Sequence, residues 1–223
     1  MGNSVGSLEQ LKQTERDILI GALLGDAHAR KVVDNRNARI EFTHSLNQKE
    51  YLFWKYQQLE RWCNRPPYMV GVRDRRYGRI WYSWRFNTKS HECFTELWQL
   101  FYRNAIKIIP STINRILKSS LSLAIWYMDD GGRRNDSYGV FLNTLSFTKK
   151  EHELLRKCLK KNFKINSRIH WITDGYRLYI PSMEAKRFSS LVHPYCVDTL
   201  QYKLPYNPVT TSFARLDRAR DRS

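Results

Sequence analysis

Residues 123–132 read Leu-Ala-Ile-Trp-Tyr-Met-Asp-Asp-Gly-Gly, an apolar run that ends in two carboxylates and two glycines. Residues 18–27, Ile-Leu-Ile-Gly-Ala-Leu-Leu-Gly-Asp-Ala, have the same form. Both runs predict a buried helix with a carboxylate, Asp26 or Asp130, at its carboxyl end. That position is unfavourable because the helix dipole is negative there. A single aspartate at the end of a helix is explained as an ordinary turn residue. Two matched instances predict a compensating cation, and divalent metal ions prefer oxygen ligands.

The pattern around these two runs repeats along the chain. Each run begins a series of helix, strand, helix, strand, strand and helix, which indicates an internal duplication. The first series is expected at 18–24, 39–43, 48–62, 68–72, 79–86 and 91–102, and the second at 121–129, 138–144, 148–162, 167–172, 176–180 and 183–192. The sequence therefore predicts an N-terminal half over 1–117, a C-terminal half over 118–207 and a basic tail over 208–223.

Composition points to an anionic partner. The 223 residues include 38 Lys and Arg against 21 Asp and Glu, a formal charge of +17. Nucleic acid offsets such a charge by releasing counterions, whereas solubility needs a charge of only about 2–8. There is no apolar run long enough to span a membrane and no secretory signal, so we expect an intracellular protein without a membrane partner. The four cysteines are widely spaced and predict free thiols rather than a zinc site.

Four segments together resemble a known family. They are Gly25-Asp26-Ala27, the run 123–132, residues 142–148 (Leu-Asn-Thr-Leu-Ser-Phe-Thr) and Tyr202-Lys203-Leu204-Pro205. They resemble the LAGLIDADG homing endonucleases in their single-chain, two-motif form. The resemblance extends over about 18–205. It implies an α+β fold of two αββαββα units about a pseudo-twofold axis, with two saddle-shaped antiparallel sheets and the motif helices at the interface.

The resemblance also implies an activity. The chain would be a monomeric, site-specific endonuclease of the intron-homing type, which hydrolyses both strands of a long duplex DNA target and leaves a staggered break. Asp26 and Asp130 would hold the metal, normally Mg²⁺ with Mn²⁺ as a substitute. Lys107 and Lys203 would complete the catalytic set as positioned charges. Asp129 is the poorer candidate ligand, because the family's register selects Asp130.

Side chains on the predicted strands would contact the duplex. Arginine to guanine is the commonest specific contact, although at least half of such contacts go to phosphate. The candidate DNA-binding residues are Arg39, Glu41, Thr43, Arg73, Arg75, Arg76, Arg79, Arg85, Asn143, Arg168, His170, Arg177 and Tyr179.

Two other functions remain open at this stage. The family also contains intron maturases, which bind intron RNA as splicing cofactors, with or without DNA cleavage. A DNA-binding regulator without chemistry would explain the charge but not the paired carboxylates. The resemblance suggests an organelle, a mitochondrion or chloroplast, or else a prokaryotic cytoplasm, and it does not decide between them.

Overall fold

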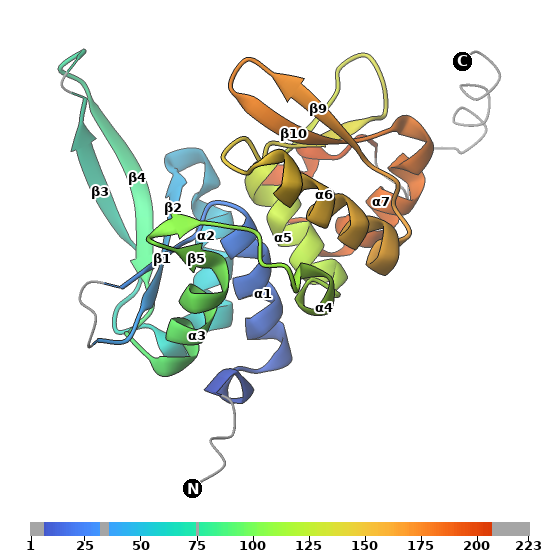
Figure 1. Cartoon of the computed structure of the whole chain (residues 1–223). Helices are drawn as coiled ribbons and strands as arrows, with labels where there is room; N and C mark the ends of the chain where they lie inside the picture. The colour runs from blue at the N-terminus through green and yellow to red at the C-terminus, as the bar shows by residue number, and fades with distance from the viewer. Residues whose placement is uncertain (1–6, 32–35, 75, 207–223) are drawn as a thin grey trace, which may run out of the picture. The chain divides into compact units, whose positions relative to one another are not determined.

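The computed structural model describes residues 7–31, 36–74 and 76–206 (Figure 1). The chain divides into two compact units, Met1–Pro110 and Ser111–Ser223. The predicted tail over 208–223 lies outside the described residues.

The division between the units falls before Ser111, whereas the sequence suggested a boundary after Leu117. Helix α4 (Ile113–Ile116) lies between these two positions and packs against α6 (Lys149–Cys158). The Sγ of Cys158 also approaches the carbonyl oxygens of Ile113 and Leu117. This short segment therefore belongs with the second unit.

The first unit builds one four-stranded sheet with its helices in the expected order. Its neighbouring strands are all antiparallel and run in the order β1-β2-β4-β3. A small hairpin of β5 and β6 follows the last helix. The elements are α1 (Gln13–Leu24), β1 (His28–Arg30), β2 (Arg39–Ser45), α2 (Lys49–Leu59), β3 (Tyr68–Arg73), β4 (Ile80–Asn87), α3 (Glu92–Phe101), β5 (Tyr102–Arg103) and β6 (Ile106–Lys107).

The second unit repeats this plan. Its sheet is antiparallel with the order β7-β8-β10-β9, the same sequence of first, second, fourth and third strand. After α4, its elements are α5 (Ser120–Asp130), β7 (Gly131–Arg133), β8 (Val140–Leu142), α6, β9 (Arg168–Ile172), β10 (Gly175–Ile180) and α7 (Ala185–Val192). The predicted α+β fold with a duplicated αββαββα order is confirmed.

Short helical turns join these elements. The 3₁₀ turns are Ser7–Gln10, Leu46–Gln48, Glu60–Trp62, Ser182–Glu184, His193–Tyr195 and Asp198–Lys203, and a π-helical turn spans Leu159–Phe163. No helix within the described residues is both apolar enough and long enough to cross a bilayer.

The two helices that carry the carboxylates are buried around their whole circumference. Every residue from Ile18 to Leu24 in α1 and from Leu121 to Asp129 in α5 is buried. A helix that is apolar on all sides is stable only inside a core, which explains the lack of a polar face in either run.

The residue pattern missed two short strands, β1 and β7, although the αββαββα order implied by the resemblance includes them. Each has three residues and begins within two positions of a candidate carboxylate, Asp26 or Asp130. Three residues are too few to display an alternating pattern, so periodicity could not reveal these strands. These strands pair with β2 and β8 and tie the carboxyl ends of α1 and α5 to the sheets.

A buried carboxylate fixes the start of α1. The Lys12 N–H donates to Glu15 Oε2 at 2.8 Å, and the Arg61 guanidinium donates to both Glu15 oxygens at 2.5 Å. Burial alone would raise the pKa of Glu15, but the hydrogen bonds from Arg61 and Lys12 reverse this effect and leave it below 4.5.

We expect Glu15→Gln to lower the free energy of unfolding at pH 7 by about 1.5–3 kcal/mol, since it removes hydrogen bonds to a charged group. Because the pKa of Glu15 is depressed in the folded state, its contribution is complete above pH 4.5 and disappears as the pH falls through the folded value. Urea unfolding at pH 7, 5 and 3 measures this. The exposed Glu9→Gln serves as control, and a difference that did not shrink as the pH was lowered below 4.5 would contradict the assignment.

Candidate active site

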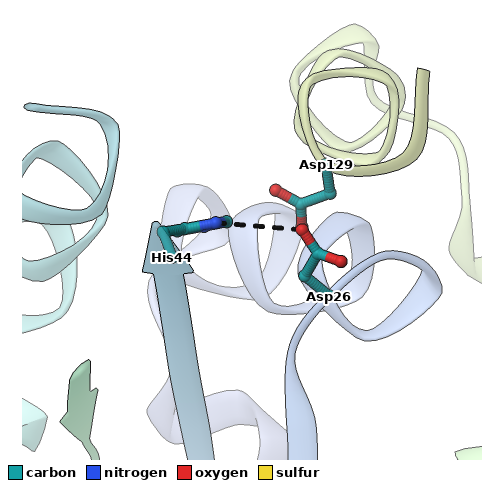
Figure 2. A group of neighbouring side chains, drawn as sticks. All are labelled: Asp26, His44 and Asp129. Atoms are coloured by element: carbon teal, nitrogen blue, oxygen red, sulfur yellow. Dashed lines mark ion pairs between the residues drawn. The ribbon is translucent and has the colours of Figure 1, made fainter. Parts of the chain in front are cut away.

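Asp26 follows α1 at the edge of the first sheet, and a buried histidine faces it (Figure 2). The Asp26 carboxylate is 45% exposed, and its Oδ2 lies 3.8 Å from Nδ1 of His44 on β2. His44 points inward because β2 alternates, with Ile40, Phe42 and His44 on the buried side. The sequence analysis did not identify His44, although this alternation was visible and places an imidazole among apolar residues.

A buried lysine orients His44. The Lys55 Nζ lies 3.0 Å from His44 Nε2, and Lys55 is completely buried on α2. Its ammonium also lies 4.1 Å from the centre of the Tyr51 ring, a favourable cation–π distance. An ammonium can only donate, so Nε2 accepts and the imidazole proton lies on Nδ1, toward Asp26. The Lys55–His44 pair therefore presents an N–H to the carboxylate.

Lys107, a predicted catalytic residue, lies beside Asp26 in the first unit. It stands at the end of β6, and its Nζ donates to the carbonyl oxygen of Gly25 at 2.7 Å. Gly25 is the residue directly before Asp26. We predicted this lysine only from a short match to the family. The fold brings it to the end of α1, although it lies 82 positions from Gly25 in the chain.

Lys203 occupies the corresponding position in the second unit. Its Nζ donates to the carbonyl oxygens of Met128 at 2.6 Å and Asp129 at 3.2 Å, just before Asp130. The Tyr127 hydroxyl in turn donates to the Lys203 carbonyl oxygen. Asp130 is the last residue of α5, and its own carbonyl oxygen accepts from the Asn143 amide at 3.1 Å. Asn143, predicted to contact DNA, therefore has a role in holding this helix end.

The two units thus share one local arrangement: a carboxylate ends a buried helix, and a distant lysine bonds the carbonyl just before it. The ammonium groups place positive charge at the negative end of each helix. Lys107 and Lys203 therefore provide the compensating cations that the sequence analysis assigned to metal. The helix dipole alone does not require a metal ion, and the argument for metal rests on the carboxylates themselves.

Asp129 and Asp130 differ in their surroundings. Asp129, drawn in Figure 2 at the end of α5, is buried, whereas Asp130 is only partly buried. Burial does not by itself show which of the two carboxylates binds metal. The choice of Asp130 rests on the alignment with the family's motif, whose last acidic position falls on Asp130.

A close approach explains the glycine after Asp130. A Cβ on Gly131 would lie 2.1 Å from Cδ2 of Tyr127 and 2.2 Å from its carbonyl oxygen. Any side chain here would displace Tyr127, whose hydroxyl holds Lys203. Gly131 therefore permits the arrangement of Asp130 and Lys203 at this helix end.

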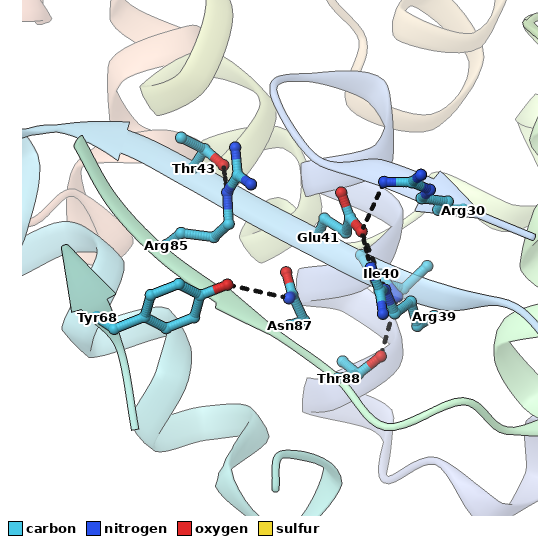
Figure 3. Close-up of polar contacts among 9 residues, drawn as sticks. All are labelled: Arg30, Arg39, Ile40, Glu41, Thr43, Tyr68, Arg85, Asn87 and Thr88. Carbon is cyan, nitrogen blue, oxygen red and sulfur yellow. Dashed lines mark hydrogen bonds and ion pairs between the residues drawn. The ribbon is translucent and has the colours of Figure 1, made fainter. Parts of the chain in front are cut away.

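The outer face of the first sheet carries several predicted DNA-binding residues in fixed positions (Figure 3). Glu41 accepts a hydrogen bond from Arg39 at 2.7 Å and forms a longer ion pair with Arg30 at 3.9 Å. Arg85 Nε donates to the Thr43 hydroxyl at 3.1 Å. These contacts orient the guanidinium groups before any ligand arrives.

The arginines of the first hairpin do not all share that face. Arg73 pairs with Ile80, which alternates with the buried Phe86, so Arg73 lies on the side of the sheet that α2 covers. Arg85 lies on the opposite side. The remaining predicted residues are the exposed Arg76 and Arg79, in the connection between β3 and β4, and Arg75, which is outside the described residues.

The outer face of the second sheet is an aromatic and cationic cluster. The Arg177 guanidinium lies 3.6 Å from the centre of the Phe141 ring, and the His170 and Tyr179 rings lie 4.8 Å apart. Strand pairing places the predicted residue Arg168 opposite Tyr179, on the same face. Partial burial, followed by the charges of Arg177 and Arg168, lowers the pKa of His170. A neutral imidazole can both donate and accept hydrogen bonds at base edges.

Comparison with known proteins agrees with this fold. The model of the LAGLIDADG DNA endonuclease family matches residues 16–188. The chain therefore belongs to the LAGLIDADG DNA endonuclease family, and it is a DNA endonuclease by that membership.

Individual relatives cover nearly the whole chain. A probable intron-encoded endonuclease 1 from Wickerhamomyces canadensis is 29% identical over 88% of this chain and 86% of its own length. The cytochrome b mRNA maturase bI2 of Debaryomyces hansenii is 31% identical over 84% of this chain and 72% of its own. The solved structure of the homing endonuclease I-WcaI bound to its DNA recognition sequence gives a TM-score of 0.82 at 27% identity, covering 93% of this chain and 96% of that chain.

Proposed function

We propose that this endonuclease is site-specific and of the intron-homing type, and that it hydrolyses both strands of a duplex to leave a staggered break. The observation that carries the proposal is the arrangement found once in each unit, a carboxylate at a helix end with a lysine on the preceding carbonyl. Two such half-sites suit the two strands of one target. The similarity to I-WcaI, a homing endonuclease solved with its recognition sequence, supports the same conclusion.

Asp26 and Asp130 would hold a divalent metal, Mg²⁺ with Mn²⁺ as a substitute. Their oxygens are the ligands that hard cations prefer, and the exposed Asp26 carboxylate is accessible to an ion and to substrate. When bound, divalent metal supplies an activated water and neutralises charge on the attacked phosphate and the leaving oxygen.

The two lysines would act on the phosphate. Lys107 and Lys203 are anchored by backbone carbonyls, so their charges have fixed positions beside the carboxylates. A fixed charge stabilises the transition state without reorganisation at the moment of reaction.

The substrate would be a long duplex that lies against the outer faces of both sheets. Arg39, Arg85, Arg168 and Arg177 are the groups that can reach phosphate or guanine from these faces. Both motifs belong to one chain, so we propose that the protein acts as a monomer. The intron-encoded relatives favour an organellar genome as its location.

Intron RNA is a second candidate partner. One relative, 31% identical to this chain, is a cytochrome b mRNA maturase. We propose splicing assistance as an addition to cleavage rather than a replacement, because a pure RNA cofactor has no need of Asp26 and Asp130.

Selection of cleaved sites tests the endonuclease proposal. The purified chain is incubated with a randomised duplex library and Mg²⁺, and the ends of cut molecules are sequenced. We expect one long preferred site, cut on both strands at staggered positions. Blunt, single-strand or sequence-independent cutting would contradict the proposal.

We expect Lys203→Met to slow cleavage of the selected site about a hundredfold while duplex affinity changes less than about threefold. Single-turnover cleavage and fluorescence anisotropy measure the two quantities, with the exposed Lys118→Met as control for lost charge. An equal loss of affinity and rate would make Lys203 a phosphate contact. If Lys203→Met lowered the free energy of unfolding but left the cleavage rate unchanged, Lys203 would only cap the helix.

A further inference from the structure

A groove lies on the inner side of the second sheet, away from the outer aromatic cluster. It has a volume of about 590 Å³ and opens between α6 and the β9–β10 hairpin. Its lining residues are Lys149, Glu153, Arg156, Ser167, Arg168, Ile169, Trp171 and Tyr176. Apart from Arg168, whose side chain strand pairing places on the outer face, the endonuclease proposal assigns no role to these residues.

An exposed tryptophan forms one wall of the groove. Trp171 is 65% exposed, although its neighbours on this side of the sheet, Ile169 and Leu178, are partly or fully buried. The Tyr176 ring packs edge-on against it, with the centroids 4.7 Å apart, and this contact fixes the plane of the indole. The Trp171 ring is therefore held in place with much of its surface in solvent.

Cationic side chains surround the indole. Lys149 and Arg156 come from α6, against one carboxylate, Glu153. Arg156 donates twice to Glu153, at 2.8 and 2.9 Å, which holds its guanidinium at the groove. Further exposed lysines continue this charge along α6 and the turn after it: Lys150, Lys157, Lys160, Lys161 and Lys164.

We propose that this groove binds single-stranded nucleic acid, with a base stacked on Trp171 and the backbone along the lysines of α6. A fixed aromatic ring beside a cationic track is the combination that binds unpaired strands. Bases in a duplex are stacked on one another and cannot offer their faces to an indole, whereas unpaired bases can.

Strand pairing separates this site from the candidate duplex surface. Trp171 pairs with Tyr176, and the adjacent pair, His170 with Arg177, points to the other face. One sheet would therefore hold duplex DNA on its outer face and an unpaired strand on its inner side. The proposal does not depend on the cleavage mechanism.

Binding of labelled 12-nucleotide RNA and DNA oligomers of one unstructured sequence tests the proposal. Fluorescence anisotropy is recorded on the full chain with excess unlabelled duplex DNA, which occupies the outer faces. We expect wild type to bind at least one of the two oligomers under these conditions. The oligomer with the higher affinity, RNA or DNA, identifies the natural polymer. We expect Trp171→Ala to weaken this binding at least about fivefold and Trp171→Phe to weaken it less, with duplex affinity unchanged within about twofold.

An exposed aromatic residue outside both sheets serves as control. Tyr195, in the turn after α7, is 41% exposed, and we expect Tyr195→Ala to leave oligomer affinity unchanged under the same conditions. The proposal is overturned if duplex displaces the oligomer completely, or if Trp171→Ala binds like wild type. It is also overturned if Trp171→Ala lowers duplex affinity by the same factor, or if polyglutamate of equal charge competes as well as the oligomer.

Discussion

Asp26→Asn and Asp130→Asn should each reduce double-strand cleavage of the selected target at least about a thousandfold. An amide has nearly the size of a carboxylate but carries no charge, so it binds divalent metal poorly. The helix ends should persist, because Lys107 and Lys203 bond backbone carbonyls that neither change removes. Affinity for the duplex should therefore remain within about threefold of wild type. Quantitative cleavage with Mg²⁺ and binding without metal are measured on the same preparations.

Asp129→Asn is the sharpest control for this prediction. Asp129 is adjacent to Asp130 in the same helical turn, but its side chain is buried. We expect its cleavage rate to stay within about tenfold of wild type. If Asp129→Asn lost cleavage while Asp130→Asn retained it, the register taken from the family would be wrong by one residue.

The repeated order of elements was predictable from the sequence, since long apolar runs and alternating strands carry strong periodic signals. The buried stretches of α1 and α5 and the inward residues of β2 follow directly from those signals. The boundary between the units was harder to place. Helix α4 has four residues, and its attachment to α6 is a tertiary contact that no local pattern encodes.

The candidate site was predictable in its residue types but not in its contacts. The sequence and the resemblance supplied Asp26, Asp130, Lys107 and Lys203. Neither could show that the lysines bond the carbonyls before the carboxylates, because those contacts join residues 74 to 82 positions apart.

The Lys55–His44 pair was missed for a different reason. A lysine in a helix is most often exposed, so its sequence position gives no sign of burial. Only the packing of α2 on β2 shows that the Lys55 ammonium is buried against an imidazole and an aromatic ring.

Removing divalent metal with excess EDTA should stop cleavage completely, and added Mg²⁺ or Mn²⁺ should restore it. The carboxylates and the attacked phosphate are all negative, and without divalent cations they repel one another as further negative charge develops on the phosphate. Cleavage that continued in excess EDTA would contradict a metal mechanism, and EDTA already saturated with Mg²⁺ is the control for the chelator itself.

The same experiment separates a catalytic metal from a structural one. Lys107 and Lys203 already place positive charge at the carboxyl ends of α1 and α5, so the folded state does not need metal to offset the helix dipoles. We therefore expect EDTA to leave the unfolding temperature unchanged while it abolishes cleavage. A metal that organised these helix ends would stabilise the fold by mass action, and its removal would lower the unfolding temperature together with the rate. Thermal unfolding and cleavage, measured in the same buffers with and without chelator, distinguish the two roles.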